Sequence, residues 1–138
     1  MDEKLKLLKQ VPLFAELDNR AIELVGRITE DVHVPAGRVL MRQGDDGDAF
    51  YIIVDGSVRV ERDGKLLKTL DAGSFVGELA LLDHGARTAT VTTDTPAHLI
   101  VLGHREFDQL IDKYADIRAQ IWACVGRRIR TLEPEAIN

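Results

Sequence analysis

Cysteine is almost absent from this chain of 138 residues, which contains only one. Because a lone cysteine cannot form an intrachain disulfide, we expect a reducing compartment, the cytoplasm. Long apolar runs are absent too, since the longest clean ones, such as 50–54 and 99–102, are far too short to span a bilayer. The chain begins Met-Asp-Glu-Lys, without the apolar region of a signal peptide. These absences predict a cytoplasmic protein that does not insert into membranes.

An excess of positive charge is also missing, since 23 acidic residues outnumber 18 basic ones and give a formal net charge of −5. This balance argues against a chain that coats nucleic acid. No nucleophile–base motif stands out, and the histidines lack the paired spacing of a metal site. The histidines are His33, His84, His98 and His104. We therefore expect no metal, no cofactor, no catalysis, and no DNA binding by this chain alone.

Glycine is concentrated in the middle of the chain, where eight of the eleven glycines lie between Gly37 and Gly85. Turn signals there separate short apolar runs, and Asp63-Gly64 is a strong hairpin signal. The runs cover 31–34, 38–42, 49–54, 57–61, 65–70, 88–92 and 98–102. Strands at such even spacing predict a mainly β fold, an eight-stranded, jelly-roll-like β roll.

Helices are expected on both sides of this β region. Asp18 resembles a helix cap, because the apolar residues after it recur at helical spacing. The helical period returns after Gly103, with a short helix and then a longer one from about 115 to 132. We predict one domain over 1–138, made of a helical flank (1–29), a β roll (30–103) and closing helices (104–133).

The most informative segment is a helix-prone run inside the β region. Gly77 lets the backbone approach a ligand, and the N–H groups that open a short helix over Glu78–Leu82 would point at that ligand. Arg87, nine positions after Glu78, offers a planar fork that suits two phosphate oxygens. Glu78 would repel a phosphate, so we expect it to accept a hydrogen bond from a neutral group such as a ribose hydroxyl. Phosphate and sugar together indicate a nucleotide; the alternative is a buried Glu78–Arg87 ion pair that joins two loops.

With these residues the sequence resembles the cyclic-nucleotide-binding domain family, which includes catabolite-activator-type regulators, cyclic-nucleotide-dependent kinases and gated channels. The resemblance runs from Val11-Pro12-Leu13-Phe14 to the closing helices. Gly77-Glu78-Leu79-Ala80 followed by Arg87-Thr88-Ala89 looks like the family's phosphate-binding cassette.

The resemblance implies a role for each residue of this cassette. Glu78 would bind the ribose 2′-hydroxyl, and Arg87 the exocyclic oxygens of the cyclic phosphate. Backbone N–H groups would complete the phosphate cradle, at Leu79, Ala80, Thr88 and Ala89. Apolar side chains would wall the base, at Val60, Leu70 and Leu79.

Thr88 bears on which nucleotide is bound. In the family, a threonine at this position is often associated with tolerance of guanine, whereas alanine is typical of some strictly adenine-selective members. The alternative is that Thr88 is simply a β-branched residue at the start of a strand. We expect cAMP to be preferred, with cGMP as the other candidate.

Arg128 is the remaining candidate for the base pocket. It falls in the middle of an apolar stripe that Ile117, Ile121 and Cys124 form at helical spacing, where an unpaired charge is costly. It could cap the purine ring, as the resemblance also implies, or extend its charge to water from a helix end. Trp122 lies on a second stripe, which either packs on the roll or forms a dimer seam.

These observations predict a cyclic-nucleotide sensor that transmits ligand occupancy through movement of its C-terminal helix. Two alternatives remain open: a degenerate, ligand-free interaction domain, and an effector domain excised from a larger transcription factor, channel or kinase. A homodimer or an unidentified effector protein would then be the partner.

Overall fold

The computed structural model describes residues 2–78, 80–83 and 85–126. Its strands are β1 (Glu30–Val34), β2 (Val39–Met41), β3 (Ala49–Asp55), β4 (Val58–Arg62), β5 (Lys65–Leu70), β6 (Phe75–Val76), β7 (Thr90–Thr93) and β8 (Ala97–Gly103). Its helices are α1 (Glu3–Gln10), the 3-10 helix η1 (Pro12–Phe14), α2 (Asn19–Arg27), α3 (Ala80–Asp83), α4 (His104–Lys113) and α5 (Ala115–Cys124).

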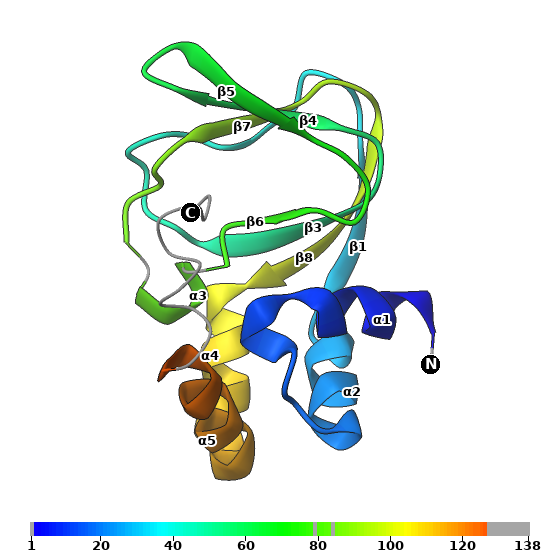
Figure 1. Cartoon of the computed structure of the whole chain (residues 1–138), viewed down its shortest axis with the longest axis vertical. Coiled ribbons are helices and arrows are strands. Elements are labelled where there is room, and N and C mark those ends of the chain that lie inside the picture. The colour runs from blue at the N-terminus through cyan, green and yellow to red at the C-terminus, as the bar shows by residue number, and fades with distance from the viewer. Residues whose placement is uncertain (1, 79, 84, 127–138) are drawn as a thin grey trace.

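The strands form two four-stranded antiparallel sheets that face each other as a β roll (Figure 1). One sheet has the order β1-β8-β3-β6 and the other β2-β7-β4-β5. Helices α1, α2, α4 and α5 lie together on the outer side of the first sheet (Figure 1). The predicted mainly β roll with helices before, within and after it is therefore confirmed.

Alternation of apolar and polar residues explains the two faces of the roll. In β4, Val58 and Val60 are buried while Arg59 and Glu61 are not, as expected for a strand with one face in the core. The predicted Asp63-Gly64 hairpin joins β4 to β5, with φ of 54° and 77°. Positive φ at both central residues is what a type I′ turn requires.

The apolar residues form two cores. One fills the space between the sheets and includes Val58, Val60 and Ala89. The other lies between the first sheet and the helices, where the ring of Phe14 contacts those of Phe50 and Phe107 at centroid distances of 6.1 and 6.2 Å. This second core attaches η1 and the closing helices to the roll.

Helix α2 begins at its predicted cap, because the Asp18 side chain accepts a hydrogen bond from the N–H of Ala21 at 2.8 Å. Helix α5 buries Ile117, Ile121 and Cys124, the predicted apolar stripe. Trp122 is 52% exposed and is not among the buried residues of α5.

Three elements differ from the sequence prediction: β6, α3, and β7, which begins at Thr90 rather than at Thr88. Strand β6 was not predicted, because two residues are too few to show an alternating pattern. The helix expected over Glu78–Leu82 is α3, which begins at Ala80. The N–H groups of Ala80 and Leu81 donate to the carbonyls of Gly77 and Glu78, three residues earlier, at 3.2 Å each.

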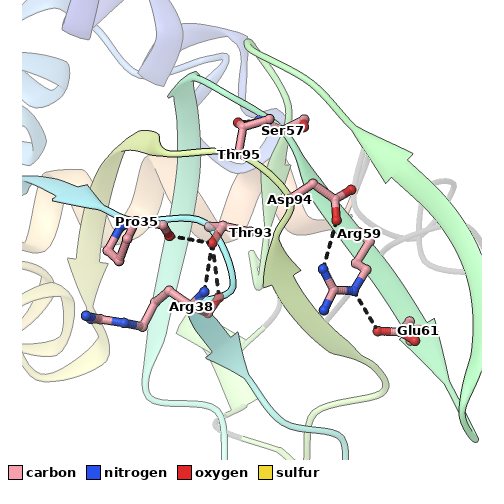
Figure 2. A network of polar contacts seen from close by, with 8 residues as sticks. All are labelled: Pro35, Arg38, Ser57, Arg59, Glu61, Thr93, Asp94 and Thr95. Carbon is pink, nitrogen blue, oxygen red and sulfur yellow. Dashed lines mark hydrogen bonds and ion pairs between the residues drawn. The ribbon is translucent and has the colours of Figure 1, made fainter.

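Polar contacts join the loops and strands of the second sheet (Figure 2). Arg59 donates to Glu61 at 3.1 Å and to Asp94 at 2.8 Å. The Thr93 hydroxyl accepts from the N–H of Arg38 at 2.9 Å and donates to the Pro35 carbonyl at 2.8 Å. In the described part of the chain, no helix is both long and apolar enough to cross a membrane.

Candidate functional site

Arg87 is buried, with 3% of its surface exposed, although it lies in the segment between α3 and β7 rather than in a strand. Its Nη2 group donates a hydrogen bond to the Ala49 carbonyl and lies 3.6 Å from Asp48 Oδ1. Its Nη1 group is also buried and has no hydrogen-bond partner among the described residues. A buried guanidinium with an unsatisfied donor is chemically suited to bind an anion.

Two glycines make room for this guanidinium. A Cβ on Gly77 would lie 2.6 Å from Arg87 Nη1, and one on Gly47 would lie 3.5 Å from Arg87 Cζ and 2.5 Å from Ala80 Cβ. Gly77 also has a φ of +85°, which other residues rarely adopt. The unpartnered Nη1 therefore lies against the Gly77 backbone, where the sequence predicted a close approach to a ligand.

The segment that carries Arg87 is held by the glycine- and aspartate-rich loop before β3. The N–H of Arg87 donates to the Asp45 carbonyl at 2.7 Å, and the Arg87 carbonyl accepts from the N–H of Gly44 at 2.9 Å. The N–H of Gly47 donates to the Gly85 carbonyl at 3.0 Å. These bonds fix the backbone of Arg87 independently of any ligand.

A cavity of about 180 Å³ lies on the aspartate side of Arg87. Three aspartates line it against two arginines, so its charge does not favour an anion: Asp45, Asp46, Asp48, Arg42 and Arg87. The Gly77 side is therefore the better approach for a phosphate. Among the described residues, no group of three or more metal-ligating side chains is placed to hold a metal ion.

Glu78 is buried as well, with 5% of its surface exposed, and its Oε1 accepts a hydrogen bond from the N–H of Leu13 in η1 at 2.9 Å. Burial raises the pKa of the Glu78 carboxyl to about 7, and the bond from Leu13 opposes that rise. Burial also lowers the pKa of the Arg87 guanidinium, while Tyr51 and Asp48 oppose the change. Among the contacts of the described residues, none joins Glu78 to Arg87, so each group has partners of its own.

Comparison with known proteins identifies the family. The family model described as "Cyclic nucleotide-binding domain" matches residues 31–114. The chain belongs to the cyclic nucleotide-binding domain family. The match includes Gly77, Glu78 and Arg87 and ends within the closing helices.

Regulatory proteins are among the relatives of this cyclic nucleotide-binding domain. It is 35% identical over 112 residues to a cAMP-dependent protein kinase regulatory subunit of Schizosaccharomyces pombe, covering 80% of this chain and 27% of that protein. It is 30% identical over 121 residues to the cGMP-dependent protein kinase egl-4 of Caenorhabditis briggsae, covering 83% of this chain and 16% of that one. The chain thus spans about a quarter or less of these relatives.

A solved structure matches nearly the whole chain. It is the N-terminal domain of a transcriptional regulator from Streptomyces coelicolor A3(2), with a TM-score of 0.81 and 30% identity, covering 94% of each chain. The domain is therefore homologous to parts of regulatory proteins with different outputs.

Of the other predicted cassette residues, the structure describes Ala80, Thr88 and Ala89. Ala80 is buried, and its N–H donates to the Gly77 carbonyl at 3.2 Å. Ala89 is fully buried, while Thr88 is exposed. Leu79 and its backbone lie outside the described residues.

The predicted base pocket is described only in part. Val60 and Leu70 come from the paired strands β4 and β5, and Val60 is buried while Leu70 is half-buried. Val60 and Ala89 belong to the same core cluster between the two sheets. Arg128 lies outside the described residues.

Sequence reasoning missed four residues that define this site: Leu13, Gly47, Asp48 and Ala49. The run Gly44-Asp45-Asp46-Gly47-Asp48 was a usable signal, because such a loop can approach another backbone closely. Leu13 and Ala49 act through backbone atoms, which leave no mark in side-chain chemistry.

Proposed function

We propose that this chain is a single, non-catalytic domain that senses a cyclic nucleotide. The unpartnered, buried Nη1 of Arg87 against Gly77 carries the proposal, because a cyclic phosphate would supply the missing acceptor. Membership of the family supports it. The cytoplasm is the proposed location, since the one cysteine is buried and needs no oxidising compartment.

Each residue of the cassette takes one part of the ligand in this proposal. Arg87 binds the exocyclic phosphate oxygens, and Glu78 accepts from the ribose 2′-hydroxyl. The N–H groups of Leu79, Ala80, Thr88 and Ala89 donate to the phosphate, with Gly77 allowing the close approach. The Ala80 N–H would have to share or leave its bond to Gly77.

The base would lie beside Val60 and Leu70, with Arg128 covering it. We propose cAMP as the preferred ligand, with cGMP as the competitor. The relatives described above include a cAMP-dependent and a cGMP-dependent protein. Thr88 could reach either a guanine edge or a phosphate oxygen, so the choice between the two nucleotides depends partly on it.

Ligand occupancy is read out through α5 in this proposal. The Leu13 N–H binds Glu78, and the neighbouring Pro12 carbonyl accepts from the Cys124 thiol of α5 at 2.9 Å. A ligand that draws on Glu78 would therefore disturb η1 and, through it, α5. The relatives are several times longer than this chain. The component that responds to the movement of α5 is therefore an attached effector domain or a partner protein, which includes a second copy of this chain.

Parallel calorimetric titrations with cAMP, cGMP and 5′-AMP test the proposal. We expect saturable one-to-one binding of a cyclic nucleotide, and much weaker binding of 5′-AMP, whose phosphate is not cyclic and carries more charge. Folded protein that binds neither cyclic nucleotide would contradict the sensor function and favour a ligand-free interaction domain. The cAMP-to-cGMP affinity ratio would decide the preferred ligand.

A further inference from the structure

The hairpin between β4 and β5 contacts the second part of the cassette, Arg87-Thr88-Ala89. The guanidinium of Arg62, the last residue of β4, donates from Nε to the backbone carbonyl of Thr88 at 2.8 Å. The two residues are 26 positions apart in the sequence, so the contact is purely tertiary. It joins the hairpin to the residue that follows Arg87.

A second set of bonds connects the same hairpin to the same segment. The Gln43 side chain donates to Asp63 Oδ1 at 2.9 Å and accepts from the Asp63 N–H at 2.8 Å. The Gln43 backbone N–H donates to the Thr90 hydroxyl at 3.0 Å. Hydrogen bonds from the hairpin and from the loop before β3 therefore fix the segment from Arg87 to Thr90.

The carbonyl that Arg62 holds belongs to a peptide unit of the proposed phosphate cradle. In a trans peptide the C=O of one residue and the N–H of the next point in opposite directions within one plane. A bond that fixes the Thr88 carbonyl therefore fixes the direction of the Ala89 N–H. Ala89 is fully buried, so that N–H is shielded from solvent and points away from Arg62.

We propose that Arg62 is a positioning residue that aims the Ala89 N–H at the cyclic phosphate by holding the Thr88 carbonyl. It acts through the backbone and does not itself bind the ligand. The inference rests on the proposed function, since it assigns a part to one more residue in the same cassette. It also explains why an exposed arginine at a hairpin donates inward to the cassette.

Arg59 provides a matched control, because it lies on the same strand three positions earlier. Its side chain binds Glu61 and Asp94, neither of which belongs to the cassette (Figure 2). Arg62→Met and Arg59→Met remove the same charge and similar volume from β4. Arg62→Lys keeps a cationic donor that can still reach a carbonyl.

The full chain and these variants would be titrated with cAMP and cGMP, and their thermal unfolding compared. We expect Arg62→Met to weaken cyclic-nucleotide binding about three- to tenfold, Arg62→Lys to recover most of the loss, and Arg59→Met to bind as the unmodified chain does. The amide proton shift of Ala89 on saturation should shrink in Arg62→Met alone, which a merely structural role would not produce.

Two results would overturn the proposal while leaving the proposed function intact. One is equal affinity in Arg62→Met and Arg59→Met, and the other is an unchanged Ala89 amide shift in Arg62→Met. If the unmodified chain itself bound neither nucleotide, the proposed function would fail, and the role of Arg62 would fail with it.

Discussion

At the scale of single residues, the site depends on a glycine, which has no side chain, as much as on its charged side chains. Gly77 leaves the space that the Arg87 guanidinium occupies, and its positive φ turns the chain toward α3. A glycine in a turn is common, but one whose added Cβ would contact a buried cation is specific to this arrangement.

Gly77→Ala should therefore abolish measurable nucleotide binding and lower stability, because its Cβ would lie 2.6 Å from Arg87 Nη1 and 2.9 Å from the Ala49 carbonyl. Gly73→Ala is the control, since Gly73 has a similar φ of +92° but nothing within 4 Å of an added Cβ. It should cost only the backbone strain, about 1 kcal/mol in chemical denaturation, and keep binding. Equal losses of nucleotide affinity and stability in the two variants would show that the close contacts of the added Cβ at Gly77 are not the cause.

The Glu78 carboxyl should make folding pH-dependent. Its pKa rises from 4.5 to about 7 on folding, so the folded state favours the protonated form. That stabilisation is complete below the unfolded pKa and is lost as the pH rises through the folded one. Relative to Glu78→Gln, the unmodified chain should lose about 3 kcal/mol of unfolding free energy between about pH 4 and about pH 8.

Urea unfolding of both proteins across this pH range would measure the difference. Gln can still accept the hydrogen bond from Leu13, so the variant removes the titration without removing the contact. Parallel pH profiles for the two proteins would show that Glu78 is not titrating in this range.

At the scale of elements, the N-terminal cap of α2 is bonded to α5. Asp18 caps α2 and also contacts Gln120 of α5, with bonds of 3.0 and 3.2 Å. Asp2 caps α1 in the same way, accepting from the N–H of Leu5 at 2.9 Å. The two caps are therefore comparable except for the link to α5.

Asp18→Ala should destabilise the fold by about 1–2 kcal/mol, because it removes both the cap and the side-chain contact with Gln120. Asp2→Ala should cost less, toward the low end of capping effects. Asp18→Ser should recover the cap but not the side-chain bond from Gln120. Chemical denaturation would compare them, and an Asp18→Ala loss no larger than that of Asp2→Ala would argue against a stabilising α2–α5 link.

Most strands and helices could be predicted because periodicity and turn chemistry are local. Asp63-Gly64 fixed the β4–β5 hairpin, and Asp18 marked the start of α2. The strand expected from Thr88 begins at Thr90, because tertiary bonds from Arg62 and Gly44 hold the preceding residues outside the ladder. That correction depends on contacts that no local pattern contains.

At the scale of the whole molecule, the candidate site joins segments far apart in the chain. Glu78 is 65 positions from Leu13, and Arg87 is 38 positions from Ala49. Sequence reasoning identified Glu78 and Arg87 because their charges are unusual in a glycine-rich turn. It could not identify the backbone groups that hold them, since every residue has the same carbonyl and N–H.

The one tryptophan allows the proposed movement of the closing helix to be observed. Trp122 lies on α5 and is 52% exposed, so its emission and its quenching by acrylamide report on the surroundings of α5. Saturation with the cyclic nucleotide that binds should change both, and 5′-AMP should not. Calorimetric saturation without any change at Trp122 would argue against transmission through this helix.

The central claim is that Arg87 binds the phosphate of a cyclic nucleotide, and a titration of Arg87→Ala tests it most directly. Arg38→Ala is the control, because the Arg38 side chain is exposed and its structural bonds are made by its backbone (Figure 2). We predict that Arg87→Ala binds cAMP and cGMP at least about tenfold more weakly than the unmodified chain, while Arg38→Ala binds normally. Unchanged affinity in a folded Arg87→Ala protein would contradict the account.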